Sequence, residues 1–120
     1  MVTAVTSMGR SGLYDWMMQR VSAVILLSYF IFIGVVLAGG VDYASWKALY
    51  AQTWMRIFSL LALLSLGAHA WVGLWAVFTD YLTERLMGTT GNVLRFCAQA
   101  VSALIMFTYV VWGIQILWGY

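Results

Sequence analysis

Three long apolar stretches dominate the pattern of hydrophobic and polar positions along the chain. They run over 21–41, 57–78 and 96–118, and they contain few or no charged residues. A helix of about twenty apolar residues crosses a hydrocarbon core about 30 Å thick. No fourth stretch of this kind occurs in the sequence. The pattern therefore predicts an all-α membrane protein with three transmembrane helices, forming a single membrane-anchor domain over 1–120.

Composition supports this prediction. Hydrophobic residues make up 64% of the 120 residues and charged residues only 8%, so a soluble domain could not cover its apolar surface. The first stretch is longer than the apolar core of a signal peptide, which is about 7–15 residues. It is therefore interpreted as an uncleaved anchor.

Basic residues are distributed unevenly between the two sides of the predicted membrane segments. Four arginines fall on one side and two basic residues on the other: Arg10, Arg20, Arg85 and Arg95 against Lys47 and Arg56. The positive-inside rule then places the N-terminus on the cytoplasmic side, or the matrix side in a mitochondrion, and the C-terminus on the periplasmic or outer side. The net charge of +2 comes without a basic cluster, which argues against nucleic-acid binding.

The connecting segments carry helix-capping and turn signals. Ser11 is a candidate cap for the helix that continues into the first span. Asp42 is a candidate cap for a short helix lying on the membrane surface, with one apolar face formed by Trp46, Leu49, Tyr50 and Trp54. Residues 82–94 are predicted to form a short polar loop with its turn at 88–92. The single cysteine, Cys97, is expected to pack as a buried thiol in the third span.

The only histidine, His69, lies near the middle of the second apolar stretch. At a rise of about 1.5 Å per residue it is roughly 18 Å from Ile57 and roughly 15 Å from Thr79. An ionisable imidazole near the bilayer midplane is costly, so its default interpretation is a ligand or a proton relay.

Small and polar residues share one side of the second predicted helix with His69. At about 100° per residue, one stripe contains Ala62, Ser65, His69, Gly73, Ala76 and Asp80. One interpretation is a helix-packing stripe in which His69 is bonded to a backbone carbonyl. The other is that Ser65 and Gly73 leave a gap in which a flat macrocycle meets the imidazole. Both remain open from the residues alone.

Neutral imidazole is a common axial ligand of haem iron, and an electron-transfer haem usually has two strong axial ligands. Because the chain has one histidine and no Cys-x-x-Cys-His string, a non-covalent bis-histidine haem needs a second histidine from another chain. Arg20 at the start of the first span could pair with haem propionates. Its alternative role is a positive charge that sets topology.

Asp80 and Tyr81 close the second stretch, on the same predicted side as Arg20. A phenol can donate a hydrogen bond to a quinone carbonyl, and a neighbouring carboxylate can orient or deliver protons. The alternative is an interfacial tyrosine anchor beside an acidic helix end. Because a carboxylate at a helix C-terminus opposes the macrodipole, a partner such as Arg85 or Arg95 is expected for Asp80.

The string from His69 to Trp75, HAWVGLW, followed by Thr79-Asp80-Tyr81, resembles the small hydrophobic anchor subunit of succinate dehydrogenase, respiratory complex II. The N-terminal residues from Gly9 through Asp15 to Arg20 are also similar to that subunit in proteobacteria. The resemblance covers the whole chain, and its most specific part is the motif formed by the histidine and the Asp-Tyr pair.

This resemblance implies a multi-pass subunit of a four-subunit enzyme in the bacterial inner membrane. A flavoprotein subunit and an iron-sulfur subunit would pass electrons from succinate to ubiquinone, and a second membrane anchor subunit would share a haem b with this chain. His69 would be one axial ligand of the haem iron, and Arg20 would lie near the propionates. Tyr81 would hydrogen-bond ubiquinone, with support from Asp80. The chain alone would have no complete active site.

Three alternatives remain. A fumarate reductase anchor would run the same chemistry in the opposite direction. A small oligomeric proton-coupled transporter would use His69 as a relay, although the spans lack the carboxylates common in such carriers. A purely structural assembly protein would use His69 only for packing.

Overall fold

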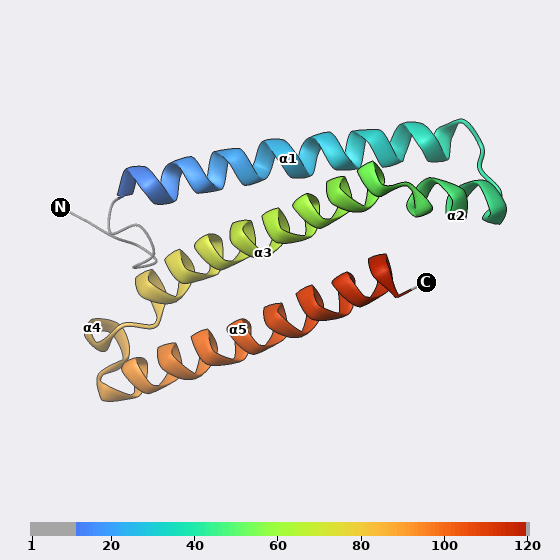
Figure 1. Cartoon of the computed structure of the whole chain (residues 1–120). Coiled ribbons are helices and arrows are strands. Elements are labelled where there is room, and N and C mark those ends of the chain that lie inside the picture. The colour runs from blue at the N-terminus through green and yellow to red at the C-terminus, as the bar shows by residue number, and fades with distance from the viewer. Residues whose placement is uncertain (1–11, 120) are drawn as a thin grey trace.

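The computed structural model describes residues 12–119, apart from the side chain of Glu84, and is built of helices joined by short turns (Figure 1). Three helices are long, with 27, 29 and 30 residues: α1 (Gly12–Ala38), α3 (Thr53–Tyr81) and α5 (Thr89–Trp118). Two are short, α2 (Tyr43–Ala51) and α4 (Glu84–Met87). The three long helices are long and apolar enough to cross a membrane, which confirms the predicted all-α class with three spans. Ser11 and Arg10 lie outside the described residues.

The long helices alternate in direction along one axis, and α3 packs against both α1 and α5 (Figure 1). The described part is elongated, with extents of 56 × 26 × 23 Å. The start of α1, the end of α3 and the start of α5 lie at one end of the molecule. The end of α1, all of α2 and the end of α5 lie at the other. Arg20 and Tyr81 therefore belong to the same half of the molecule.

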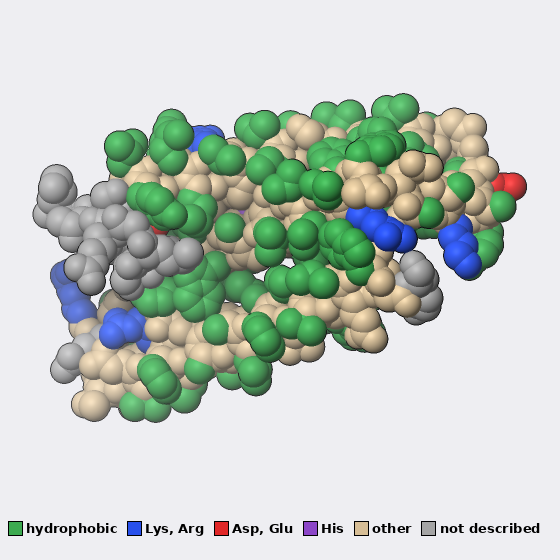
Figure 2. Space-filling view, in the orientation of Figure 1, with side chains coloured by type: hydrophobic (Ala, Val, Ile, Leu, Met, Phe, Trp, Pro, Cys, Tyr) green, Lys and Arg blue, Asp and Glu red, His purple; other side chains and the backbone are tan. Residues whose placement is uncertain are grey.

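Most large apolar side chains point outward rather than into a core. Figure 2 shows hydrophobic side chains along the sides of the long helices, with Lys and Arg gathered toward the two ends. Buried residues make up 22% of the most apolar window of α3, compared with 6% in α1 and 0% in α5. A surface this apolar is suited to lipid or to another membrane subunit rather than to water.

The first predicted span ends earlier than expected. Helix α1 stops at Ala38, and Gly40 follows with a φ of 77°, a backbone conformation that glycine adopts without the steric cost of a Cβ. Val41, the predicted last residue of the span, therefore lies in the turn. Asp42 then caps α2 as predicted, because its Oδ1 accepts a hydrogen bond of 2.8 Å from the Ser45 backbone N–H. Hydrogen bonding to Ser45 lowers the pKa of Asp42.

The aromatic residues around α2 do not all share one helix. Trp46 and Tyr50 lie within α2 with ring centroids 4.9 Å apart. Trp54 was predicted on the same helical face, but the chain breaks at Gln52 and Trp54 belongs to α3. There it packs edge-on against Phe32 of α1, with ring centroids 5.9 Å apart.

The predicted polar loop over 82–94 is mostly helical. Thr83 accepts hydrogen bonds in the first turn of α4. Of the turn predicted over 88–92 only Gly88 lies in a turn, because α5 already begins at Thr89. The chain reverses at Gly88, which has a φ of 68°. Gly91 lies directly against the Thr83 carbonyl, where a Cβ would collide with it.

Cys97 is exposed on α5 and is a free thiol, so the prediction of a buried thiol is wrong for this chain. Helix α5 packs along one face against α3 and, near its start, contacts α4. Its remaining faces, including the position of Cys97, are directed outward.

Candidate functional site

His69 lies on the α1-facing side of α3, where it contacts a serine. Its Nδ1 is 3.1 Å from the Oγ of Ser22 on α1. Ser22 is only 4% exposed, and its hydroxyl donates to the backbone carbonyl of Gln19 at 3.0 Å. The imidazole is therefore bonded to a side-chain hydroxyl, rather than to the backbone carbonyl that the packing interpretation expected. The Nε2 atom has no hydrogen-bond partner among the described residues.

Gln19 occupies the space beside Gly73, one turn after His69 on α3. A Cβ built on Gly73 would be 3.6 Å from the Gln19 amide nitrogen. Gly73 therefore does not leave an open gap, contrary to the macrocycle interpretation of the stripe, because the Gln19 side chain lies over it. The Gln19 Oε1 atom is buried and has no hydrogen-bond partner among the described residues. A buried acceptor of this kind is costly unless a donor from outside the chain reaches it.

An open apolar groove lies between α1 and α3, and Ser22, the partner of His69, is one of its lining residues. It has a volume of about 360 Å³, and its polar lining is limited mainly to Ser22, Ser65 and Tyr14, among Met, Leu, Ile, Val and Ala side chains. Ser65 and Ala68 bring this groove next to His69. His69 itself is not among the residues that line the groove. An apolar groove that is open on one side can take the edge of a flat macrocycle covered by a neighbouring chain, and a neutral imidazole is a ligand that haem iron accepts. The chemistry of these residues is therefore compatible with a haem.

Arg20 is exposed on α1, and its guanidinium carbon lies 5.5 Å from the centre of the Trp16 ring. It is two residues from Ser22, so the two side chains leave the helix about 200° apart. Ser22 faces His69, and Arg20 points away from that contact. The structure thus brings Ser22, rather than Arg20, to the imidazole, and it leaves the guanidinium accessible to a group outside the chain.

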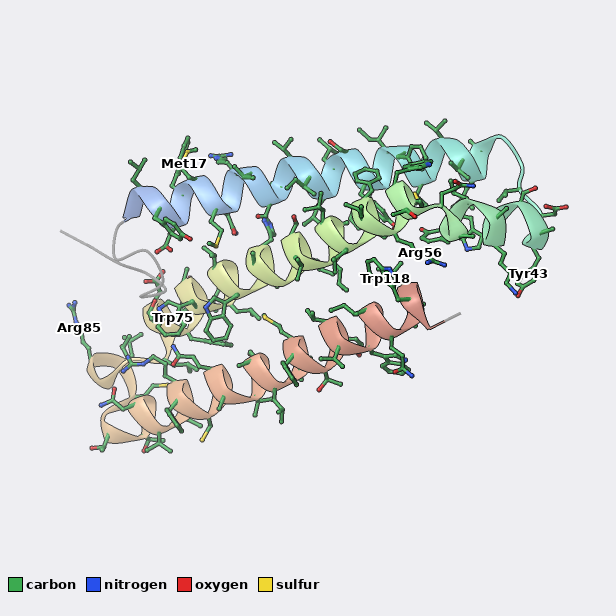
Figure 3. All side chains as sticks on the ribbon, in the orientation of Figure 1. Met17, Tyr43, Arg56, Trp75, Arg85 and Trp118 are labelled. Atoms are coloured by element: carbon green, nitrogen blue, oxygen red, sulfur yellow. The ribbon has the colours of Figure 1, made fainter. Side chains whose placement is uncertain are left out.

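Asp80 and Tyr81 lie at the last turn of α3 and are both exposed, Tyr81 by 66%. The expected partner of Asp80 is not found: no ion pair joins it to Arg85 or Arg95 in the described part of the chain, and Arg95 donates to the Asn92 side chain at 3.2 Å instead. Figure 3 shows Arg85 at this end of the molecule, directed outward from α4. Any site formed by Asp80 and Tyr81 is open to a neighbouring subunit.

A second polar cluster lies at the opposite end of the helices. The Tyr29 hydroxyl on α1 is 2.7 Å from the Tyr50 hydroxyl on α2 and 2.8 Å from the Ser59 hydroxyl on α3. Arg56 donates through Nε to the Tyr50 carbonyl at 3.2 Å. Burial, followed by hydrogen bonding to Tyr29, raises the pKa of Tyr50 well above its usual value. These contacts join α1, α2 and α3 at one point. We therefore assign the cluster a structural role.

Sequence reasoning did not identify Ser22 and Gln19. Both are polar residues three positions apart at the start of a strongly apolar helix, so they share a helical face. This spacing was the only feature of the sequence that could have indicated a polar contact face on the first helix. It could not show that the face meets His69, because the register between two helices depends on packing.

Known proteins resemble this chain over most of its length. The family model described as succinate dehydrogenase/fumarate reductase transmembrane subunit matches residues 2–110. A curated relative from Coxiella burnetii (strain RSA 493 / Nine Mile phase I), a succinate dehydrogenase hydrophobic membrane anchor subunit, is 33% identical over 111 residues. That alignment covers 91% of this chain and 90% of the relative.

Proposed function

Because the chain belongs to the family of succinate dehydrogenase and fumarate reductase transmembrane subunits, we propose that it anchors a succinate dehydrogenase in the bacterial inner membrane, binds haem b and contributes to a ubiquinone site. Membership of this family implies association with the other subunits of the complex. The proposed partners are a flavoprotein, an iron-sulfur subunit and a second membrane anchor. The proposed orientation has the N-terminus in the cytoplasm and the C-terminus in the periplasm.

The observation that carries the haem proposal is the contact between His69 and Ser22. It holds the only imidazole of the chain near the middle of a spanning helix. Among the described residues nothing bonds to Nε2, and Ser22 also lines an apolar groove. His69 would be one axial ligand, and a histidine of the second anchor the other. When bound, haem b supplies a one-electron carrier within the membrane. Arg20 would pair with a propionate, which its exposed position allows.

The ubiquinone proposal rests on the exposed Asp80-Tyr81 pair at the end of α3. The Tyr81 hydroxyl would donate a hydrogen bond to a quinone carbonyl and so orient the ring. The Asp80 carboxylate, one residue before it, would support the site by orienting protons needed when the quinone is reduced. Because both side chains are exposed in this chain, residues of the other subunits would complete the site and exclude water.

Purification of the native complex through a tag on this chain tests the proposal. We expect a flavoprotein, an iron-sulfur protein and a second membrane protein to co-purify, and the reduced-minus-oxidised spectrum to contain a b-type haem signal. Ubiquinone-dependent succinate oxidation, faster than quinol-dependent fumarate reduction, would favour the succinate dehydrogenase direction. Isolation of a homo-oligomer without haem would overturn the proposal in favour of the transporter. If the enzyme subunits co-purify but no haem is present, the haem proposal fails and His69 serves only in packing.

A further inference from the structure

We propose that Ser22 is a positioning residue that fixes the tautomer and the orientation of His69, so that Nε2 is the atom presented to haem iron. This inference rests on the proposed haem function. It concerns a residue on a different helix from the ligand, 47 positions away in the sequence.

The hydrogen-bonding capacity of Ser22 sets the direction of the contact. A serine hydroxyl has one proton to donate and two lone pairs to accept with. We assign this proton to the Gln19 carbonyl, 3.0 Å away, because a carbonyl can only accept, whereas Nδ1 can donate or accept according to the tautomer. Toward the imidazole, 3.1 Å away, the Ser22 oxygen therefore acts as an acceptor. Nδ1 of His69 then carries the proton, and Nε2 keeps its lone pair.

Burial gives this arrangement its strength. Ser22 is 4% exposed and Ser65, on the adjacent turn of α3, is 7% exposed, so water does not compete well for the Nδ1–H group. A hydrogen bond from the distal ring nitrogen of a metal-bound histidine fixes the ring and makes the metal-bound nitrogen a stronger donor. Ser22 would therefore influence both haem retention and haem potential without touching the haem iron.

The chain offers a matched control on the same helix. Ser28 also bonds to a carbonyl of α1, that of Val24 at 2.8 Å, but its side chain is exposed and does not contact His69. Ser28→Ala removes the same chemical group and the same kind of intrahelical bond. A difference between Ser22→Ala and Ser28→Ala would therefore report the contact with His69 rather than a general effect of serine on the helix.

The experiment compares the haem midpoint potential, the electron paramagnetic resonance spectrum and the haem-to-protein ratio in the assembled complex. In Ser22→Ala we expect the potential to move upward, because a weaker imidazole donor stabilises ferric iron less. We expect haem affinity to fall roughly ten- to hundred-fold. Ser22→Thr keeps the hydroxyl and should return all three readouts toward the unmodified complex, and Ser28→Ala should not change them.

Two outcomes would contradict the inference in distinguishable ways. If His69→Leu leaves the bis-histidine signal intact, the ligand assignment fails and the role of Ser22 fails with it. If His69→Leu alters the signal but Ser22→Ala matches Ser28→Ala, only the role of Ser22 is overturned. If the Ser22→Ala complex assembles poorly, the Ser22→Cys variant is used instead, and the same three properties are measured. Its weaker sulfur acceptor should shift the potential upward relative to Ser22→Thr, and equal potentials would reject the inference.

Discussion

His69 and Tyr81 belong to one unbroken helix, α3, and are twelve residues apart. This separation corresponds to about 18 Å along the helix axis. His69 contacts α1 through Ser22, whereas Tyr81 is exposed at the helix end. The proposed haem ligand and the proposed quinone donor are therefore rigidly linked but chemically separate, and their substitutions should have separable effects.

Replacement of His69 should affect the haem more than the quinone reaction. In His69→Leu the iron loses one axial ligand, so we expect the low-spin bis-histidine spectrum to disappear or change to high-spin. Haem can still be retained by the second ligand and the apolar groove. Spectra and succinate–ubiquinone activity are measured on the same preparation. A loss of quinone reduction with an unaltered haem spectrum would contradict the assignment.

Replacement of Tyr81 should have the opposite pattern. Tyr81→Phe removes the hydroxyl and leaves the ring, so a quinone carbonyl loses its donor. We expect ubiquinone reduction to fall about five- to hundred-fold, corresponding to roughly 1–3 kcal/mol, while succinate oxidation by a soluble artificial acceptor persists. Tyr109→Phe is the control, because Tyr109 has a similar exposed fraction, 62% against 66%, but lies on α5. Equal quinone reduction in both variants would identify Tyr81 as an interfacial anchor only.

Arg20 provides an electrostatic test of the propionate proposal. A positive charge near the haem favours the reduced, less positive iron, so Arg20→Gln should lower the haem midpoint potential. Arg85→Gln removes the same charge from α4 at the same end of the molecule and should have a much smaller effect. The measurement is a redox titration of each complex at one ionic strength. Equal haem midpoint potentials in the two variants would indicate that Arg20 serves only as a positive charge that sets the orientation of the helix in the membrane.

The sequence predicted the spans well because long apolar stretches have few alternatives to transmembrane helices. It also identified Asp42 as a cap, since capping depends on residues only three positions apart. It located the turn at Gly88 but extended it too far, because the glycine and polar residues over 89–92 belong to the first turn of α5. Residues at a helix start and in a loop have similar composition, so boundaries are less predictable than spans.

Contacts between helices were less predictable than the helices themselves. The small-residue stripe on α3 correctly indicated a packing face, as the burial of Ala62 and Ser65 shows. The sequence could not indicate which residue of α1 would meet His69, or that Gln19 would lie over Gly73. Both depend on the register between α1 and α3. The roles of His69, Arg20, Asp80 and Tyr81 remain predictions.

Topology can be tested with reporter fusions at two positions. A reporter active only in the cytoplasm should be active after Met87, next to the proposed cytoplasmic end of α5, and inactive after Tyr120. A periplasmic reporter should give the reverse result. Because α5 separates the two positions, reporters on the same side of the membrane would contradict the three-span topology, and exchanged sides would contradict only the orientation.

The connection between α3 and α5 depends on close packing at Gly91. Gly91 is buried, and a Cβ at this position would collide with the Thr83 carbonyl, which cannot move without displacing the turn before α4. Overpacking of this kind costs about 1–3 kcal/mol. Gly91→Ala should therefore lower the thermal stability of the assembled complex and the amount of this subunit in the membrane.

Gly34 is the matched control, because it lies within α1 and a Cβ there would have no neighbour within 4 Å. Alanine is favoured over glycine inside a helix by about 0.5–1 kcal/mol, so Gly34→Ala should leave stability unchanged or raise it. Opposite effects of the same glycine-to-alanine change at the two positions would show that contact with Thr83, rather than helix propensity, governs Gly91. If Gly91→Ala is as stable as Gly34→Ala in the assembled complex, the close approach of α5 to Thr83 is not present there.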